Sequence, residues 1–324
     1  MAQQQQPART VCVTGGGGFI ASWIIKLLLQ RGYTVRATVR DPGDKKKNGF
    51  LASFESASQN LTLHKADLLD YDALSSAIMG CEGVFHVASP ILARDEVGFL
   101  DPAIKGTLNV LRACHEAKVK RVILTSSVVT TIFDPNRPVD AIVDESYWSD
   151  IDYNRKHEQW YTLSKTLAEK AAWQFAKENE LDLVTMLPAL VFGPSLDSTI
   201  NPSNSILYRL VTGVSLSEYN FSYGYVHVKD TAEAHILAYE NPIASGRYLC
   251  VESVLYFTDL LEYLEKLFPN YTYNKRCFEE MTTSGFVPGK FSNQKVVNLG
   301  IRFTPLEQTL KETILDFKEH GFIN

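Results

Sequence analysis

The chain has 324 residues, of which 45% are hydrophobic and 21% charged, and its formal net charge is −5. A chain of this length can bury a large core and form one big α/β domain or two unequal lobes. The mild negative charge gives no reason to expect a nucleic acid or a membrane surface as partner. No apolar run approaches the roughly 20 residues that a membrane helix needs.

The N-terminus and the cysteines indicate where the protein works. Residues 1–9, MAQQQQPAR, contain no apolar segment, so we expect a disordered tail and no signal peptide. The five cysteines form no C-x-x-C pair, which is typical of reduced thiols in a cytoplasmic protein. The seven histidines show no metal-ligand spacing, and we expect no bound metal.

Apolar runs alternate with helical stretches over the first 193 residues. Strands are expected at 11–14, 34–39, 61–68, 83–89, 121–127 and 183–193, and helices at 19–32, 72–81, 103–119 and 161–180. Strands that are apolar on both faces and follow each other through helices form parallel sheets covered on both sides. The pattern therefore predicts an α/β protein with a Rossmann-like, doubly wound parallel sheet.

The pattern becomes irregular after residue 193. Residues 194–223 are rich in Ser, Asn and Pro, and 223–240 are typical of one more strand and helix. Further helices are expected at 257–268 and 304–321. We expect residues 10–193, with about 224–240, to form the larger domain. Residues 194–223 and 241–324 are expected to form a smaller, irregular α/β substrate-binding lobe at the C-terminal end.

The first strand and helix are joined by TGGGGFIA, a T-G-x-x-G-x-x-A pattern that begins at Thr14. Gly15 permits a tight turn, and Gly18 lets backbone N–H groups approach a pyrophosphate at the helix N-terminus. Ala21 is small enough for the helix to lie close to the strand. A glycine cluster alone indicates only a turn, but this one lies between a strand and a helix, which predicts dinucleotide binding.

The end of the second strand indicates which dinucleotide. An NAD-binding turn usually places an acid about 20 residues after the glycines to bind the ribose 2′-hydroxyl. This chain has Thr38 and Val39 there, followed by Arg40, with Arg36 and three lysines, 45–47, nearby. A guanidinium can hold a 2′-phosphate, whereas a carboxylate would repel it. The larger domain is therefore predicted to bind NADP(H), although surface cations without a ligand would give the same pattern.

A second pattern points to chemistry. Tyr161 and Lys165 are four residues apart in an expected helix, so they share one face. Ser126 and Ser127 end the fifth strand, at the sheet edge where ligands of such folds bind. Tyr161 can act as proton donor to a carbonyl oxygen, Lys165 can lower its pKa, and Ser127 can hydrogen-bond the oxygen. A satisfied serine pair at a strand end is the alternative for 126 and 127.

These motifs resemble the extended short-chain dehydrogenase/reductases. RGYTVRATVRDP, KADLLDYD, GVFHVASP, AKVKRVILTSS, SKTLAEKAAW and YVHVKDTAEAHILAYE, in this order, are similar to the plant cinnamoyl-CoA reductase and dihydroflavonol reductase group. The resemblance implies cofactor contacts at several places. Phe19 and Ile20 would lie beside the glycines, Arg40 and Lys46 would contact the 2′-phosphate, and Asp67 and Leu68 would contact the adenine. Val87, Ala88 and Ser89 would lie along the cofactor, Pro188, Ala189, Leu190 and Val191 would lie beside the nicotinamide, and Ser203 would contact a phosphate or ribose.

The chain also departs from that group. Cinnamoyl-CoA reductases carry NWYCYGK around the tyrosine, where this chain has QWYTLSK. They hold their thioester with a His-x-x-Lys pair and an arginine, and the matching positions here are Ile206, Arg209 and Phe257. Apolar Ile206 and Phe257, with Phe221, are expected to line a pocket for an aromatic substrate.

We therefore predict an NADPH-dependent reductase that converts a small aromatic, phenylpropanoid-type aldehyde or ketone to the alcohol. Reduction of hydroxycinnamoyl-CoA thioesters is the alternative, since one cation, Arg209, is retained. A sugar-nucleotide epimerase would use the same tyrosine and lysine but with NAD, and a binding module without chemistry would not need them. The sequence does not fix the oligomeric state, and a monomer is compatible with it.

Overall fold

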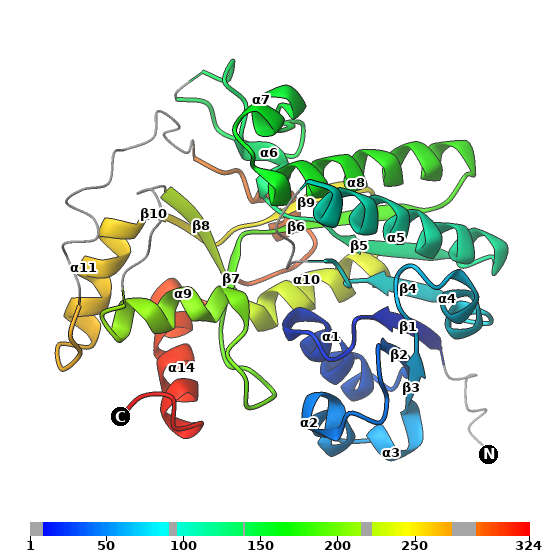
Figure 1. The fold of residues 1–324 in the computed structure, drawn as a ribbon, viewed down its shortest axis with the longest axis horizontal. Coiled ribbons are helices and arrows are strands. Elements are labelled where there is room, and N and C mark those ends of the chain that lie inside the picture. Colours follow the sequence, from blue (N-terminus) through cyan, green and yellow to red (C-terminus); the bar gives the residue numbers. More distant parts are fainter. Residues whose placement is uncertain (1–8, 91–95, 139, 215–221, 274–289) are drawn as a thin grey trace.

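A seven-stranded sheet forms the centre of the larger part of the molecule (Figure 1). The computed structural model describes residues 9–90, 96–138, 140–214, 222–273 and 290–324. The strand order is β3-β2-β1-β4-β5-β6-β9, and all neighbouring pairs are parallel. The strands are β1 (Thr10–Thr14), β2 (Thr34–Val39), β3 (Leu61–Lys65), β4 (Gly83–His86), β5 (Arg121–Thr125), β6 (Leu183–Pro188) and β9 (Gly246–Cys250). The predicted doubly wound α/β fold is confirmed.

Helices cover both faces of this sheet. Helices α1 (Phe19–Gln30) and α10 (Val228–Glu240) pack together on one face, and α4 (Tyr71–Ile78), α5 (Glu96–Glu116) and α8 (Trp160–Glu178) cover the other (Figure 1). The alternation of side chains along β1 serves both layers. Val11 and Val13 pack with the core of the first layer, and Cys12 packs with the core of the second.

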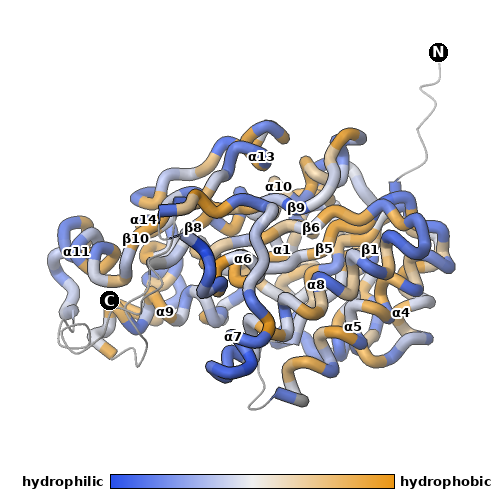
Figure 2. Tube along the Cα trace, turned by 90° about the horizontal axis from the view of Figure 1, so that it is seen from above, coloured by the Kyte–Doolittle hydropathy of each residue, from blue (hydrophilic) through white to orange (hydrophobic). Residues whose placement is uncertain are grey.

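Burial differs between the centre and the edge of the sheet. Every residue of β4, β5 and β6 is buried, whereas no residue of the edge strand β3 is fully buried. In Figure 2 the central strands run among hydrophobic segments, while the peripheral helix α7 (Ile151–Lys156) is hydrophilic. This explains why the inner strands were the clearest apolar runs in the sequence.

A three-stranded sheet carries the smaller lobe. Strand β7 (Leu190–Phe192) is parallel to β8 (Ser222–His227), which is antiparallel to β10 (Ser253–Tyr256). Helices α9 (Pro202–Val211), α11 (Phe257–Leu267) and α14 (Leu306–Glu319) pack on these strands around a separate apolar core. Short helical turns complete the described chain: α2 (Lys45–Asn48), η1 (Gly49–Ser53), α3 (Ala57–Asn60), α6 (Val129–Ile132) and α13 (Gln294–Val297).

Two adjacent segments join the sheets. The run expected as one strand at 183–193 leaves the large sheet at Ala189, so β6 and β7 belong to different sheets. Beside it, β9 leads into β10, and the Ala189 N–H donates to the Cys250 carbonyl at 3.0 Å. On β7, Val191 packs in the core under the large sheet, and Phe192 packs in the core of the small lobe. The small sheet thus lies between two cores.

The C-terminal strands are distributed differently from the expectation. Strand β8, expected with the larger domain, pairs in the small sheet, although α10 after it packs on the large one. Residues 246–250, which were expected in the small lobe but not as a strand, form β9 and pair with β6. The sequence of β9, GRYLC, contains the buried Arg247, so it shows no apolar run. Helix α5 begins at Glu96, seven residues before the predicted start at 103. The expected tail lies outside the described residues except for Arg9.

Candidate active site

The glycine turn is fixed between the ends of β1 and β4. Gly15 has φ +70°, and a Cβ atom on it would lie 3.0 Å from Ala88 Cα and Cβ, so only glycine fits here. The Thr14 hydroxyl accepts the N–H groups of Val87 and Ala88 at 3.0 Å each. Its own hydrogen then goes to His86 Nδ1, 2.9 Å away. Val87 and Ala88, both expected at the cofactor, are therefore tied to the turn.

The N-terminus of α1 is open to an anion. Gly18 caps the helix without a side-chain hydrogen bond, and the first turn contains no acidic residue. The first intrahelical hydrogen bond runs from the Ser22 N–H to the Gly18 carbonyl at 2.8 Å. The preceding N–H groups, including those of the partly exposed Phe19 and Ile20, lie in the turn that has no intrahelical acceptor. This arrangement fits the pyrophosphate of a dinucleotide.

The cations in and after β2 differ in whether they have hydrogen-bond partners within the protein. Arg40 and Lys46 are exposed and make no hydrogen bond or ion pair with the described residues. Arg36, in contrast, donates to the carbonyls of Ala77 and Met79 at the end of α4, at 3.3 and 2.7 Å. Arg40 and Lys46 therefore fit a 2′-phosphate, whereas Arg36 holds a helix end.

The ends of β3 and β4 provide the expected adenine side. The exposed Asp67 carboxylate accepts the Leu69 N–H at 3.0 Å. The Leu68 carbonyl accepts from Asn109 on α5 at 3.0 Å, and its side chain lies against Gly106. Leu68 also lines a pocket together with Ser89 and Pro90.

The three expected catalytic residues come from β5 and α8. Ser127 follows β5 and is 9% exposed, and Lys165 is 8% exposed on the buried face of α8. The Lys165 ammonium donates to the Thr125 carbonyl at 3.2 Å. Tyr161 lies one turn before Lys165, partly exposed, and its ring meets that of Phe99 on α5 edge-on at a centroid distance of 6.5 Å.

Burial shifts both titratable groups of this cluster. It raises the pKa of Tyr161, and a hydrogen bond from Ser127 opposes this rise. It lowers the pKa of Lys165 to about 8, against the opposing charge of Glu169. Tyr161 is therefore protonated at neutral pH, and Lys165 is mostly charged. Perturbed groups that converge at a sheet edge are typical of catalytic sites.

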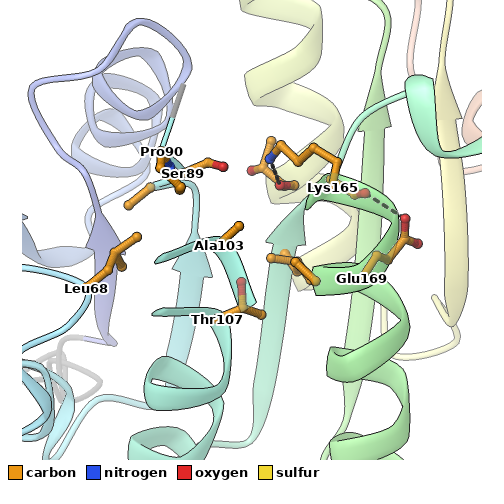
Figure 3. Close-up of a pocket in the computed structure, with 12 residues that line it drawn as sticks. Leu68, Ser89, Pro90, Ala103, Thr107, Lys165 and Glu169 are labelled. Carbon is orange, nitrogen blue, oxygen red and sulfur yellow. Dashed lines mark hydrogen bonds between the residues drawn. The ribbon is translucent and has the colours of Figure 1, made fainter. Parts of the chain in front are cut away.

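One pocket is lined both by residues of the expected adenine side and by residues of this cluster. Figure 3 shows Leu68, Ser89 and Pro90 on one side and Lys165 with Glu169 on the other, with Ala103 and Thr107 of α5 between them. Thr125 and Ser126 at the end of β5 complete the lining on the Lys165 side. The pocket thus connects the two groups of residues that the sequence predicted separately.

The expected nicotinamide wall lies beside Ser127. The Pro188 carbonyl, at the end of β6, accepts the Val128 N–H at 3.0 Å. Ala189 and Val191 are buried, and Leu190 is partly exposed. Ser203 lies in the first turn of α9 and makes no hydrogen bond with the other expected site residues that the structure describes.

Of the three residues expected to line the substrate pocket, the structure describes two, and both pack on the core of the small lobe. Phe257 is 0% exposed and packs on Tyr223 with ring centroids 4.5 Å apart, so its ring fills the core of the small lobe. Ile206 is partly buried against the same core. Phe221 lies outside the described residues. The aromatic character of Phe257 therefore serves packing.

Several residues that support the site were not singled out in the sequence. Glu169 and Arg247 form a buried ion pair behind Lys165. Asn48 is buried beside Gly17 and donates to the Asp41 carbonyl at 2.8 Å. Only Glu169 had a signal, because it follows Lys165 by one helical turn on the same face.

The described residues contain no cluster of three or more side chains able to hold a metal ion. Among the helices that the structure describes, none has the length and apolarity required to span a bilayer. The four described cysteines, Cys12, Cys81, Cys114 and Cys250, are buried free thiols.

The chain is similar to known proteins. The family described as "NAD dependent epimerase/dehydratase family" matches residues 11–249. The chain belongs to this family. It is 49% identical to cinnamoyl-CoA reductase 2 of Medicago truncatula over 97% of this chain and 93% of that protein. It is an NAD(P)-dependent oxidoreductase of the extended short-chain dehydrogenase/reductases and is similar to the plant cinnamoyl-CoA reductases.

Solved structures of family members agree with the fold. Vestitone reductase from alfalfa superimposes with a TM-score of 0.83 at 35% identity, covering 97% of this chain and 99% of that one. The yeast methylglyoxal/isovaleraldehyde reductase Gre2, solved with NADPH, has the same TM-score at 26% identity and covers 97% and 100% of the two chains. The family member described here thus has reductases among its structural neighbours.

Proposed function

We propose that this protein uses NADPH to reduce an aromatic, phenylpropanoid-type aldehyde or ketone to the alcohol. The observation that carries the proposal is the convergence of Ser127, Tyr161 and Lys165 at the carboxyl edge of the sheet, next to an open helix N-terminus. Such an edge is the usual ligand site of doubly wound sheets.

The three side chains have separate tasks. NADPH, when bound, supplies the hydride that the carbonyl carbon accepts. Tyr161 gives its hydroxyl proton to the carbonyl oxygen, so that the product is a neutral alcohol. Ser127 hydrogen-bonds the same oxygen and holds it in place. The ammonium of Lys165 stabilises the tyrosinate left behind, because an isolated tyrosine, with a pKa near 10, is a weak acid at neutral pH.

The preference for NADPH over NADH is assigned to Arg40, with Lys46 assisting. Both cations are exposed at the end of β2 and α2, and neither is engaged by the described residues. A 2′-phosphate would give them a partner, and an Arg–phosphate contact can be bidentate. The NADPH bound in the yeast relative is in line with this assignment.

A free carbonyl is favoured as substrate because two of the three positions matched to the thioester-binding residues are apolar. Ile206 and Phe257, at the positions where thioester reductases carry a histidine and an arginine, pack in an apolar core. Neither can donate a hydrogen bond to a phosphate. A site that lacks such donors discriminates strongly against a substrate that needs them.

Thioester reduction is the second candidate. The 49% identity to cinnamoyl-CoA reductase 2 favours it, and Arg209 on α9 keeps one cation at the matching positions. In that reaction the same Tyr161 and Lys165 would act on a thioester carbonyl, and coenzyme A would leave as the thiol, so that the product is an aldehyde. The two candidates therefore differ in the substrate and in the leaving group, and share the residues that act on the carbonyl oxygen.

The experiment compares kcat/KM for an aromatic aldehyde and for the matching acyl-CoA, both with saturating NADPH. We expect the aldehyde to be favoured by about tenfold or more. The double variant Ile206→His with Arg209→Lys, which reinstates the His-x-x-Lys pair, should raise kcat/KM for the thioester and leave the aldehyde value unchanged. A wild-type preference for the thioester would assign the second candidate instead.

A further inference from the structure

We propose that Glu169 and Arg247 are positioning residues of the reductase: their buried ion pair holds the segment around Ser127 against the Lys165 face of α8. The inference rests on the proposed function, because it assigns a task relative to Ser127 and Lys165. It adds two residues, 78 positions apart in the chain, to the machinery that keeps the reacting groups in register.

Glu169 collects hydrogen bonds from three strands and its own helix. Its Oε2 atom accepts from Ser126 Oγ at 2.6 Å, at the end of β5. Its Oε1 atom accepts from Thr185 Oγ1 on β6 at 3.1 Å and from Arg247 Nε on β9 at 2.8 Å. Trp173, one turn further along α8, donates to Oε1 at 3.3 Å. The carboxylate is 1% exposed, so water takes little part in this network.

Arg247 extends the network to the segment that follows Ser127. Its Nη1 atom donates to the carbonyls of Glu145 and Tyr147 at 2.7 and 2.6 Å. Its Nη2 atom donates to Thr130 Oγ1 on α6 at 2.8 Å. The guanidinium lies over the Trp148 ring, with Cζ 3.7 Å from the centroid. Each nitrogen of this buried guanidinium therefore has at least one acceptor.

Glu169 and Arg247 hold the chain on either side of Ser127, one through the residue before it and the other through a residue after it. Ser126, immediately before it, is bonded to Glu169. Thr130, which Arg247 holds, donates its hydroxyl to the Ser127 carbonyl at 2.9 Å and its N–H at 3.1 Å. A displacement of either charged side chain would move the backbone that carries the Ser127 hydroxyl. This convergence distinguishes the pair from an ion pair that only joins a helix to a sheet.

Glu169 also acts on Lys165 through charge. The titratable and charged groups around Lys165 are Tyr161 and Glu169 on α8, His86 at the end of β4, and Arg247 on β9. His86 is neutral because burial, together with Lys165, lowers its pKa to about 3. Glu169 is therefore the anion that opposes the loss of the Lys165 proton by burial.

Stability alone does not account for such a pair. Taking two charges out of water offsets much of their attraction, and apolar replacements of similar volume are often as stable. Buried polar networks that are fully satisfied do, however, fix a unique geometry. A small misplacement of reacting groups lowers a rate by as much as about a hundredfold.

The test is Glu169→Gln, which keeps the shape of the side chain and removes its charge. We expect kcat with saturating NADPH to fall about tenfold to a hundredfold. The decline of kcat/KM at alkaline pH should begin at a lower pH than in the wild type, because Lys165 loses its anion. The matched control is Glu178→Gln, on the same helix but exposed, where the carboxylate accepts a hydrogen bond from the exposed Gln174. It should leave both quantities unchanged.

A folded Glu169→Gln variant with wild-type kcat and an unmoved alkaline limb would overturn the proposal. If this variant does not fold, Ser126→Ala decides, since it deletes one hydroxyl and leaves the ion pair intact. A fall in kcat of severalfold, with unchanged unfolding temperature and NADPH affinity, supports positioning. A kcat within twofold of the wild type contradicts it.

Tyr161→Phe, measured in parallel, separates this proposal from the proposed function. If Tyr161→Phe stays active, the reductase mechanism itself is wrong. If Tyr161→Phe is inactive and Glu169→Gln behaves as the wild type, only the positioning role is lost.

Discussion

Lys165 and Arg40 lie at the same edge of the large sheet, yet the protein surrounds these two cations in opposite ways. Lys165 is 8% exposed, donates to the Thr125 carbonyl and has Glu169 one turn further along the helix. Arg40 is exposed and has no partner among the described residues. A group that assists proton transfer needs a fixed position and a shifted pKa, and burial provides both. A group that recognises a phosphate needs unused donors, and exposure leaves them free.

The largest loss of activity is expected in the buried cluster around Lys165, when its proton donor Tyr161 is changed. Tyr161→Phe deletes one hydroxyl, and we expect kcat to fall by about 10²–10⁴-fold, the contribution of a positioned acid. The dissociation constant for NADPH, measured by fluorescence titration, should change little. Tyr263→Phe is the control and should keep full activity, because the Tyr263 hydroxyl donates to Glu307 on α14 in the small lobe. Near-normal turnover in Tyr161→Phe would remove the tyrosine from the mechanism.

A change at the exposed Arg40 should alter the choice between NADPH and NADH and leave the proton-transfer step unchanged. Arg40→Ala is expected to reduce the preference for NADPH over NADH by about ten- to a hundredfold, since a charge-assisted hydrogen bond contributes roughly 1.5–3 kcal/mol. The matched control is Lys47→Ala in α2, because the Lys47 ammonium already lies 3.6 Å from the Asp44 carboxylate. The measurement is kcat/KM for both cofactors. An unchanged ratio in Arg40→Ala would mean that the arginine is only surface charge.

Titration of Lys165 gives a third way to separate the two cations. Because the pKa of Lys165 is lowered to about 8, kcat/KM for the carbonyl substrate should decline by roughly tenfold per pH unit above that value. An activity that stays level up to pH 10 would show that the charge on Lys165 is not needed.

Stability should change with pH in the opposite direction from activity, because the burial of charged Lys165 destabilises the folded protein. Its folded pKa of about 8 lies below the ordinary 10.5, so between these values the unfolded chain binds more protons. The free energy of unfolding therefore rises with pH through this window, and the burial penalty is fully present below pH 8. Thermal unfolding of the wild type and Lys165→Met across pH 7–10.5 measures it. The wild type should gain stability relative to the variant as pH rises.

The smallest effect is expected in the other lobe. Phe257→Leu should lower the free energy of unfolding by roughly 1–2 kcal/mol, because the ring is fully buried against Tyr223. KM for an aromatic aldehyde should stay within about twofold of the wild type. A large rise in KM without a loss of stability would instead place the Phe257 ring in contact with substrate.

Local patterns predicted much of this molecule. The strand–glycine–helix succession and the Tyr161–Lys165 spacing depend on residues that are close in sequence, and each has a geometric meaning of its own. The alternation of apolar runs with helices predicted the large sheet because its inner strands are buried on both faces. The pairing of Arg40 with a phosphate remains a prediction.

Features that depend on distant contacts were missed. Arg247 is invisible as a site residue because its partner Glu169 lies 78 positions away and its strand has no apolar run. Because of Arg247, β9 was not predicted as a strand, and residues 246–250 were assigned to the wrong lobe. For Phe257, sequence gives an aromatic residue at the start of a helix, but only packing decides whether the ring faces a ligand or a core.

The bend at Ala189 also constrains how the length of this chain can change. Val191 and Phe192 point into different cores, and on β8 Val226 and Tyr225 divide in the same way. Because strand side chains alternate, one inserted residue at Ala189 would exchange the two faces of β7. A phenylalanine would then crowd the core of the large sheet, and a valine would leave a void in the other core. A change in the number of residues at this bend would therefore disturb both cores at once.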